Sequence, residues 1–283
     1  MQQETYYKNI ELYYQQSLNA YKDAWAMDTA QAIHYGYWDA EVSTFKQSLG
    51  RMNEVMAAFA NIKQGESVLD AGCGVGGSSF YLAKNFGCNC TGITLSTHQL
   101  NLAKIYQKQK QLEALTHFEI MDYTATTFAN ESFDIVWGCE SICYAYDKQV
   151  FLKEVHRLLK PGGRFIMADG MLPNFRNNKH STIAKWLKGW QVNYLETPER
   201  WQQFGALLGF KNIKYKNITP FTKQSSKRLL WFSIAGIPYI AWNKLFGKQK
   251  WTTIQKDNIY ACWHQYWGLK KGLWNYGVIT MTK

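Results

Sequence analysis

The strongest constraint on the fold is an alternation of short apolar segments and longer amphipathic ones between residues 67 and 168. Short apolar runs bounded by turn residues are typical of buried strands, whereas apolar residues at spacings of three and four are typical of helices. Strands that alternate with helices build a parallel sheet with helices on both faces. We therefore expect an α/β fold with a doubly wound, mostly parallel sheet, whose ligands bind at the carboxyl ends of the strands.

The positions of these elements can be predicted individually. The expected strands are residues 67–70, 90–94, 117–121, 133–137 and 164–168. The expected helices between them include residues 97–110 and 149–159. Pro161-Gly162-Gly163 should stop the second of these helices, because proline and glycine disfavour a helix interior.

The flanking sequence suggests three parts. Residues 1–60 are predicted to be N-terminal helices that form a lid, interrupted by a turn at 34–38. Residues 61–170 form the core, and residues 171–283 form a mostly helical, aromatic cap with closing strands. The last of these, near residues 274–281, should form a strand pair at the edge of the sheet.

The predicted cap contains one long apolar run, residues 229–246. Gly236 and Pro238 interrupt it and Lys244 ends it, so it is too short and broken for a membrane-spanning helix. Two interpretations stay open. It is a buried helix of the cap, or a segment that lies at a membrane surface.

Charge is unevenly distributed along the chain. Residues 1–170 hold 14 Lys/Arg and 18 Asp/Glu, a balance of −4, whereas residues 171–283 hold 18 and 3, a balance of +15, which sum to the total of +11. The second part also carries nine of the twelve tryptophans. Basic and aromatic residues together fit a nucleic acid, an anionic membrane or a phosphorylated ligand, and commonly also a solvated surface over an aromatic core. We expect no nucleic-acid partner and keep peripheral contact with an anionic membrane open.

The termini and cysteines point to a cytoplasmic protein. Residues 1–5 lack the basic and then apolar run of a secretory signal. The six cysteines form no CxxC pair, and Cys88 and Cys90 are spaced too closely for an easy disulfide. We therefore expect reduced thiols and no metal site. The oligomeric state cannot be predicted from these features.

A glycine-rich loop follows the first predicted strand, from Asp70 to Gly77. Glycines allow positive φ and leave no Cβ between backbone and ligand. The spacing Gly72, Gly74, Gly77 also satisfies the dinucleotide fingerprint. Two features oppose a dinucleotide: an acidic residue ends the strand two positions before the first glycine, and Thr94 stands where a carboxylate would hold the ribose. The loop thus favours S-adenosylmethionine (SAM).

Four motifs in order strengthen this interpretation: residues 68–77, residues 92–96 with Gln99, residues 133–137 and residues 159–164. They resemble the motifs of class I SAM-dependent methyltransferases, in particular the sterol, tocopherol and cyclopropane-fatty-acid-synthase-like enzymes that act on small molecules. The resemblance covers about residues 60–170. It implies SAM as cofactor and S-adenosylhomocysteine as product. The cofactor-binding residues that it implies are Asp70, Gly72, Gly74, Gly76, Thr94, Leu95, Gln99, Asp122, Tyr123 and Cys139.

The ribose site departs from the common family pattern. Thr94-Leu95-Ser96 replaces the usual acidic ligand, but it is similar to the version found in tocopherol, coclaurine and cyclopropane-forming relatives. Upstream, residues 34–38 look like the aromatic segment that closes over SAM in sterol, tocopherol and phosphoethanolamine relatives. The departure therefore affects the expected ribose contact and not the cofactor.

Residues 140–147 follow the fourth predicted strand and are similar to the Glu-Ala-Thr-Cys-His-Ala-Pro-Asp segment of sterol C-methyltransferases. Tyr144 replaces the histidine and Tyr146 the proline. A histidine at this position acts as base in sugar and antibiotic O-methyltransferases, whereas a tyrosine, with an ordinary pKa of about 10, is a poor base at neutral pH. The substitution therefore favours methylation of carbon over methylation of a hydroxyl.

Carbon methylation of an alkene leaves a carbocation that must survive until a proton departs. Aromatic faces stabilise a cation by roughly 0.5–2 kcal/mol each when desolvated, and exclusion of water prevents its capture. The residues that we expect to bind the acceptor are Tyr35, Trp38, Trp186 and Trp190. The expected catalytic residues are Glu140, Tyr144, Asp169 and His34, with Glu140 as the leading candidate for removing the proton.

Each of these assignments has a structural alternative. Asp70 could cap the next helix, Glu140 could bind backbone, His34 could be an ordinary hydrogen-bonded histidine, and the tryptophans could be packing residues. We expect a methyltransferase for a small hydrophobic acceptor, with carbon methylation of a sterol-like or isoprenoid lipid as the leading hypothesis. The alternatives are N- or O-methylation of a hydrophobic amine, quinol or secondary metabolite, and a protein that keeps the fold without turning over.

Overall fold

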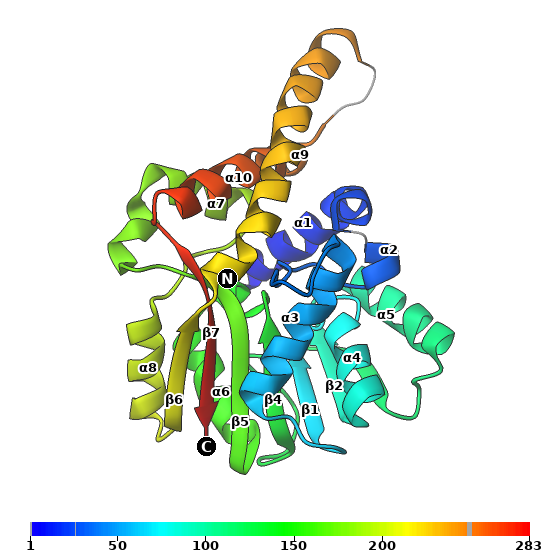
Figure 1. Ribbon diagram of the computed structural model, residues 1–283, viewed down its shortest axis with the longest axis vertical. Coiled ribbons are helices and arrows are strands. Elements are labelled where there is room, and N and C mark those ends of the chain that lie inside the picture. The colour runs from blue at the N-terminus through cyan, green and yellow to red at the C-terminus, as the bar shows by residue number, and fades with distance from the viewer. Residues whose placement is uncertain (1, 26, 248–250) are drawn as a thin grey trace.

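A seven-stranded sheet in the order β3-β2-β1-β4-β5-β7-β6 forms the centre of the molecule in a computed structural model, which describes residues 2–25, 27–247 and 251–283 (Figure 1). β1 to β5 run parallel, and β7 lies antiparallel between β5 and β6. The strands are β1 (Ser67–Ala71), β2 (Asn89–Thr94), β3 (Thr116–Ile120), β4 (Phe133–Cys139), β5 (Leu159–Met171), β6 (Lys211–Asn217) and β7 (Asn275–Thr282). The expected mostly parallel, doubly wound sheet is confirmed.

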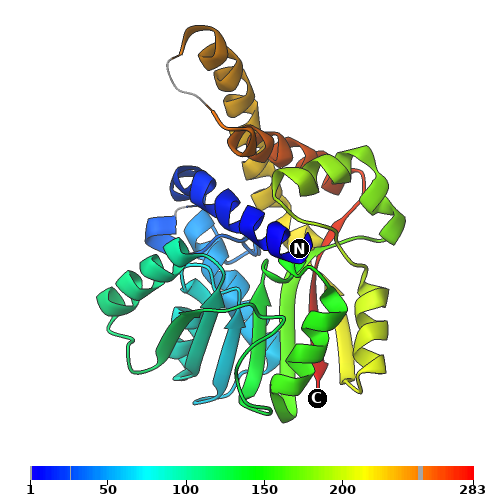
Figure 2. The same ribbon diagram turned by 180° about the vertical axis from the view of Figure 1, so that it is seen from behind.

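Helices cover both faces of the sheet and its carboxyl ends (Figures 1 and 2). The α-helices are α1 (Gln2–Trp25), α2 (Met27–Ala30), α3 (Phe45–Ala60), α4 (Gly77–Phe86), α5 (Thr97–Lys110), α6 (Lys148–Leu158), α7 (Ser181–Gly189), α8 (Pro198–Leu207), α9 (Thr219–Phe246) and α10 (Thr253–Lys270). Two short 3₁₀ turns, η1 (Ile142–Tyr144) and η2 (Phe175–Lys179), follow β4 and β5.

The alternation of side chains along each strand explains the two layers of core. Val68 belongs to the core layer that contains residues of α3 and α4, and its neighbour Leu69 to the layer that contains residues of α6 and α8, because successive strand residues point to opposite faces. Ile166 and Phe165 on β5 divide in the same way. Both faces of the parallel strands are therefore buried, which accounts for their continuous apolar sequence.

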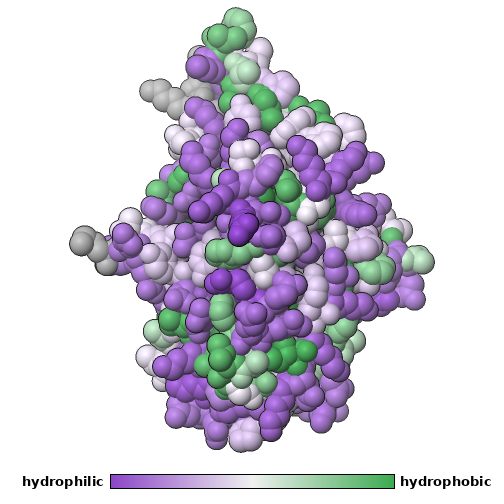
Figure 3. Space-filling view, turned by 90° about the vertical axis from the view of Figure 1, so that its left-hand side faces the viewer, coloured by the Kyte–Doolittle hydropathy of each residue, from purple (hydrophilic) through white to green (hydrophobic). Residues whose placement is uncertain are grey.

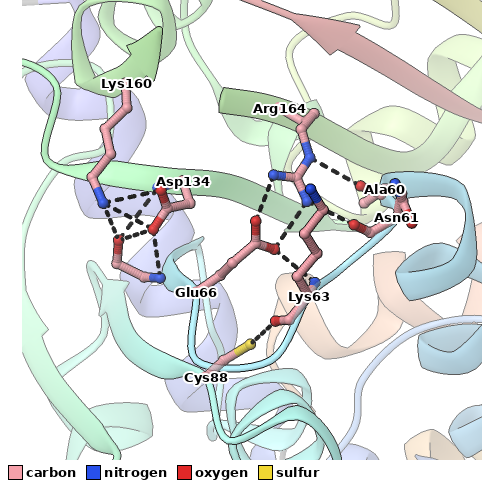
Figure 4. Close-up of polar contacts among 9 residues, drawn as sticks. Ala60, Asn61, Lys63, Glu66, Cys88, Asp134, Lys160 and Arg164 are labelled. Atoms are coloured by element: carbon pink, nitrogen blue, oxygen red, sulfur yellow. Dashed lines mark hydrogen bonds and ion pairs between the residues drawn. The ribbon is translucent and has the colours of Figure 1, made fainter. Parts of the chain in front are cut away.

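The amino ends of β1 and β4, opposite the ligand-binding edge, are held by ion pairs (Figure 4). Arg164 pairs with Glu66 at 2.7 Å and donates to the carbonyls of Ala60 and Asn61, which tie the end of α3 to the sheet. Lys160 pairs with Asp134 at 2.9 Å in the same region. The lysine and arginine that flank the Pro-Gly-Gly segment thus fix the scaffold and do not face the ligand site.

The structure differs from the expectations in four places. The Pro161–Gly163 segment belongs to β5, which starts at Leu159 with an irregular register beside β4. Residues 211–217, expected to be helical, form the edge strand β6, and β7 therefore lies inside the sheet. α9 runs through Gly236 and Pro238 without a break.

Two groups of helices lie over the carboxyl ends of the strands. α1 crosses above them on one side, and α7 and α10 pack together on the other, while the outer part of α9 and the start of α10 project beyond the rest (Figures 1 and 2). α3, which the predicted lid of residues 1–60 includes, lies against β5. In the described residues, no helix combines the length and apolar character needed to cross a membrane.

Candidate active site

Two cavities meet above the carboxyl ends of the strands. The first lies against the glycine loop and the second lies below α7 and α10, and both are partly open to solvent. Tyr14, Ile33, Glu140 and Tyr144 line both cavities, so these four residues mark the place where the two spaces join. A ligand in one cavity would therefore meet a ligand in the other beside Glu140.

The glycine loop shapes the floor of the first cavity. Gly74 has φ +55°, and a Cβ at this position would point into open space. Gly72 has φ +85°, and its Cβ would lie 2.5 Å from Cβ of Ser141 on the loop after β4. The loop thus needs glycine for its conformation at both positions, and at Gly74 it leaves free space where a side chain would intrude. This cradle fits the amino-acid part of SAM.

Asp70 ends β1 at the rim of the first cavity and is buried. Its Oδ2 accepts a hydrogen bond of 2.7 Å from the hydroxyl of Ser79 on α4. Burial raises the pKa of Asp70 to about 6, although the bonds from Ser79 lower it. The carboxyl therefore binds the first turn of α4, as the structural alternative predicts, and it also lines the cavity, where its contact with a ligand stays a prediction.

Thr94 and Gln99 provide polar atoms to the part of the first cavity where the ribose is predicted to bind. The Thr94 hydroxyl donates to Oε1 of Gln99 at 2.8 Å and accepts from the backbone N–H of Ser96 at 3.2 Å. Ser96 caps α5 by accepting from the N–H of Gln99. The end of β2 thus carries a neutral network in place of a carboxylate.

His34 presents a buried ring nitrogen beside the first cavity, and its hydrogen bonds show which ligand groups this cavity fits. Its Nδ1 lies 2.9 Å from the carbonyl of Tyr35, which can only accept, so Nδ1–H donates and Nε2 is an acceptor. Within the described residues Nε2 is buried with no hydrogen-bond partner, and His34 lines the first cavity. An unpaired buried acceptor beside a glycine cradle fits a ligand with hydrogen-bond donors. Burial lowers the pKa of His34, which keeps the ring neutral.

Glu140 follows β4 at the junction of the cavities, with φ +51°, a conformation that is strained for a residue with a side chain. Its Oε1 accepts two hydrogen bonds, from the Tyr35 N–H at 2.5 Å and the Tyr276 hydroxyl at 2.6 Å. Burial raises the pKa of Glu140 to about 8, despite these two donors. The site therefore holds a carboxyl that exchanges its proton near neutral pH, as a general acid or base requires.

Asp169 and Lys148 shape the loop beyond Glu140. Asp169 lines the second cavity and accepts from the N–H groups of Cys143 and Gly170 at 2.9 and 2.8 Å, and burial raises its pKa to about 6. The buried Lys148 ammonium donates to the carbonyls of Cys143 and Ala145 and lies 3.8 Å from the centre of the Tyr194 ring. Burial lowers the pKa of Lys148 to about 8. The two side chains thus hold the loop from both sides.

Aromatic rings form much of the wall of the second cavity. Three of the four predicted acceptor-binding residues, Tyr35, Trp186 and Trp190, line it. Trp38 lines neither cavity, because its indole N–H donates to Ser225 on α9 at 3.0 Å. Trp274 and Tyr276 from β7 complete the wall, and the Trp186 and Trp274 ring centres are 4.5 Å apart.

The predicted cofactor-binding residues fall into two groups. Gly76 and Asp122 line neither cavity. A Cβ at Gly76 would collide with Phe80 and Phe118, so this glycine serves packing, and the Asp122 carboxylate accepts from the N–H and hydroxyl of Thr124 in a turn. The residues that do line the first cavity are Asp70, Gly72, Gly74, Thr94, Leu95, Gln99, Tyr123 and Cys139.

Sequence reasoning missed two contributions to the site. α1 places Ile10, Glu11 and Tyr14 on the first cavity, although the sequence indicated only that a helix lies there. Tyr276 reaches Glu140 from the last strand, 136 residues further along the chain. The alternating pattern of β7 predicts a strand, but no sequence signal shows that its tyrosine faces the catalytic end.

Comparisons with known proteins agree with this geometry. A family model described as a methyltransferase domain matches residues 69–167. A probable chloroplastic tocopherol O-methyltransferase of Oryza sativa subsp. japonica is 27% identical, over 95% of this chain and 76% of that protein. The 2-methyl-6-phytyl-1,4-hydroquinone methyltransferase of Synechocystis sp. is 36% identical, over 60% of this chain and 55% of that protein. The aligned region thus spans about half to three quarters of these relatives.

Solved structures share the fold at low sequence identity. Geranyl diphosphate C-methyltransferase of Streptomyces coelicolor A3(2), bound to Mg²⁺, geranyl diphosphate and S-adenosylhomocysteine, superposes with a TM-score of 0.73 at 18% identity, over 98% of this chain and 97% of that one. The [4+2]-cyclase SpnF superposes with a TM-score of 0.77 at 17% identity, over 98% and 96%. Because identity is low, these similarities establish the fold alone.

Sheet order, glycine cradle and joined cavities together define a doubly wound domain with two adjoining cavities at the carboxyl ends of its strands. The matched region identifies residues 69–167 as a methyltransferase domain, and the fold around it is that of the class I SAM-dependent methyltransferases. SAM is the cofactor of this family, and the first cavity is where the residues fit it.

Proposed function

We propose that this protein methylates a carbon atom of a small, apolar, isoprenoid-like acceptor bound in the second cavity. The observation that carries the proposal is Glu140, a buried carboxyl with a pKa of about 8, placed where the cofactor cavity opens into an aromatic chamber. A cytoplasmic location is part of the proposal, and it is supported by six free cysteines, most of them buried.

SAM supplies an electrophilic methyl group on a positively charged sulfur. The double bond of the acceptor provides the electron pair for the new carbon–carbon bond, and the sulfur keeps the pair of the bond that breaks. The acceptor is left with a positive charge, which the faces of rings such as Tyr35, Trp186 and Trp274 stabilise by roughly 0.5–2 kcal/mol each. The same rings exclude water that would capture this charge.

Glu140 completes the reaction as the proposed proton acceptor. Its carboxylate form takes the proton that the cationic acceptor loses, while the hydroxyl of Tyr276 and the N–H of Tyr35 hold Oε1 in place. Asp169, the other carboxyl on the chamber wall, has both oxygens bound to backbone N–H groups and is proposed as a positioning residue. Tyr144 lies at the junction and orients the acceptor.

Methylation of a hydroxyl or amine is the second candidate. It is favoured by the rice relative, whose name specifies O-methylation of tocopherol, and by a carboxyl pKa close enough to that of a phenol to share its proton. The two candidates differ in the atom that carries the new methyl group, so the product distinguishes them.

Isotopically labelled SAM tests both candidates. The protein is incubated with a prenyl alkene, a prenylated hydroquinone and a hydrophobic tertiary amine, each in turn, and S-adenosylhomocysteine release is measured with the position of the label by NMR. We expect label on carbon. Label on oxygen or nitrogen would establish the second candidate. Tight binding of S-adenosylhomocysteine without turnover of these acceptors or of a lipid extract from the host would show a fold that has lost methyl transfer.

A further inference from the structure

The outer half of α9 carries an apolar face that is open to solvent. Six exposed residues form this face, and we call them the outer stripe: Trp231, Ile234, Tyr239, Trp242, Leu245 and Phe246. Leu245 and Phe246 are 75% and 74% exposed, and Trp231 and Trp242 are 60% and 55% exposed. At 100° per residue these six lie within an arc of about 140° on one side of the helix. Such a contiguous exposed patch marks a site of interaction.

The opposite side of the same helix segment packs against the protein. The outer stripe is therefore the solvent-facing side of a helix that is held in place on its other side. Ser233, Ile240 and Asn243 are buried, on the side away from the outer stripe. A Cβ at Gly236 would lie 3.0 Å from Ile259 on α10, so the absence of a side chain there lets the two helices approach closely. α9 and α10 thus pack closely together, and the outer part of α9 projects from the molecule (Figure 1), where the space-filling view shows hydrophobic residues near the top (Figure 3).

The aromatic residues of the outer stripe also pack against one another. The Tyr239 and Trp242 rings stack with centres 6.2 Å apart, and Trp242 lies 6.3 Å from Phe246. Rings that are already in contact lose little side-chain freedom when a partner covers them. Tryptophan and tyrosine are also the residues most enriched at the boundary between lipid and water.

Charge around the stripe decides which partner fits. Residues 219–271 contain nine lysines and arginines and one acidic residue, Asp257. Lys223, Lys227 and Lys244 are exposed along α9 itself. A second copy of this chain would bring the same positive charge to the contact, whereas a bilayer with anionic lipids brings negative charge together with an apolar interior.

We propose that the outer stripe of α9, flanked by these lysines, docks the protein on the surface of an anionic lipid bilayer. The stripe extends about 22 Å along the helix, from fifteen residues at 1.5 Å each, and would lie in the interface plane. Its apolar side chains enter the boundary between headgroups and acyl chains, and the lysines bind lipid phosphates. Every atom of this contact comes from the chain and the lipid, so docking requires neither SAM nor acceptor.

The inner part of α9 and part of α10 line the second cavity, which is the proposed acceptor chamber. Leu229 on α9 and Asn258 and Cys262 on α10 are part of its wall, and Leu229 precedes Trp231 by two residues. Docking would therefore bring the chamber close to the bilayer in which an apolar acceptor dissolves. This consequence rests on the proposed function, whereas docking itself does not.

Vesicle sedimentation tests the proposal with the full chain and no other ligand. Vesicles of phosphatidylcholine alone and of phosphatidylcholine with phosphatidylglycerol are compared at low and high salt, and tryptophan fluorescence is recorded in parallel. We expect binding to the anionic vesicles at low salt, a blue shift on binding, and weaker binding at high salt. A wild-type protein that stays in the supernatant with anionic vesicles at low salt would overturn the proposal.

Variants locate the contact. The triple substitution Trp242→Ser, Leu245→Ser and Phe246→Ser should weaken vesicle binding by roughly tenfold or more, since each removes an exposed apolar side chain that enters the bilayer in the docked state. Leu207→Ser on α8, where the leucine is 85% exposed, is the matched control and should bind as the wild type does. Binding of S-adenosylhomocysteine by calorimetry confirms that each variant is folded. Equal vesicle binding by the triple variant, or dimerisation that the triple variant abolishes without vesicle binding, would refute a membrane contact.

Discussion

At the scale of single residues, Glu140 shows how burial and hydrogen bonds set the pKa of a buried carboxyl. Two donors to Oε1 favour the carboxylate, but desolvation is the larger effect and raises the pKa to about 8. The protonated form is therefore dominant at neutral pH, and the fraction of carboxylate grows as the pH rises through the pKa. A role as proton acceptor requires the carboxylate.

Replacement of Glu140 by glutamine tests this role. In the wild type, kcat/KM should rise with pH and level off above a pH of about 8, because only the carboxylate accepts a proton. Glu140→Gln should lower kcat by roughly 100-fold or more and remove this inflection, while SAM affinity, measured by calorimetry, stays the same. Persistence of the inflection in the variant would assign the titration to another group, and equal loss of SAM affinity would make the role structural.

Tyr276 acts on the reaction through Glu140. Tyr276→Phe removes one donor to the carboxylate, so the pKa of Glu140 should rise further and the inflection in kcat/KM should move to higher pH, with a loss of roughly tenfold at neutral pH. Tyr215→Phe is a matched control, because Tyr215 on β6 donates to Asn275, which lies beside Tyr276 on β7, and no hydrogen bond joins Tyr215 to Glu140. An unchanged pH profile in Tyr276→Phe would show that this hydrogen bond does not tune the carboxyl.

At the scale of elements, the parallel core was predictable and the C-terminal part was not. β1 to β4, the central part of β5, and α5 are close to where the sequence places them, since buried parallel strands have continuous apolar sequences that are easy to detect. β6 (Lys211–Asn217) consists of lysines and asparagines, with Ile213 and Tyr215 as its two apolar residues. Its pairing with β7 at the sheet edge decides its structure, and lysine-rich sequence suits an edge strand.

For α9, the sequence predicts an interruption that the structure does not have. Gly236 and Pro238 predict an interruption, yet the helix continues through both. Tertiary packing overrides the local preference there, since the lack of a side chain at Gly236 lets Ile259 of α10 approach. The glycine is thus explained by helix contact, which is not visible in the sequence of one helix.

The turn between β1 and α4 yields a prediction for the cofactor site. Gly74→Val should reduce SAM affinity by at least roughly 100-fold, because the side chain would strain a backbone at φ +55° and fill the cavity. Gly209→Val, at φ +89° with open space around it on the far side of α8, introduces similar strain without touching the cavity and should bind SAM normally. Calorimetric titration compares the two, and normal affinity in Gly74→Val would refute the cofactor assignment.

At the scale of the whole molecule, the site is assembled from segments that are far apart in the sequence. The junction of the cavities takes Tyr14 from α1, Ile33 from the following turn, and Glu140 and Tyr144 from the loop after β4. Motifs within residues 61–170 predicted many of the residues that line the first cavity, because these residues follow each strand in order. The walls of the second cavity were predicted less completely, since β7 and α1 reach it only through tertiary packing.

This arrangement predicts how the molecule responds to its cofactor. Ile10, Glu11 and Tyr14 make α1 one wall of the first cavity, so a bound ligand should hold α1 in place and suppress its local opening. S-adenosylhomocysteine should slow backbone hydrogen exchange, measured by mass spectrometry, in α1 as well as in the glycine loop, and leave α8 unchanged. α8 serves as the internal control because it packs on the sheet and α6, away from both cavities. Slower exchange in the glycine loop alone would mean that α1 does not close over the cofactor, and the wall seen in the structure would then not be part of the binding site.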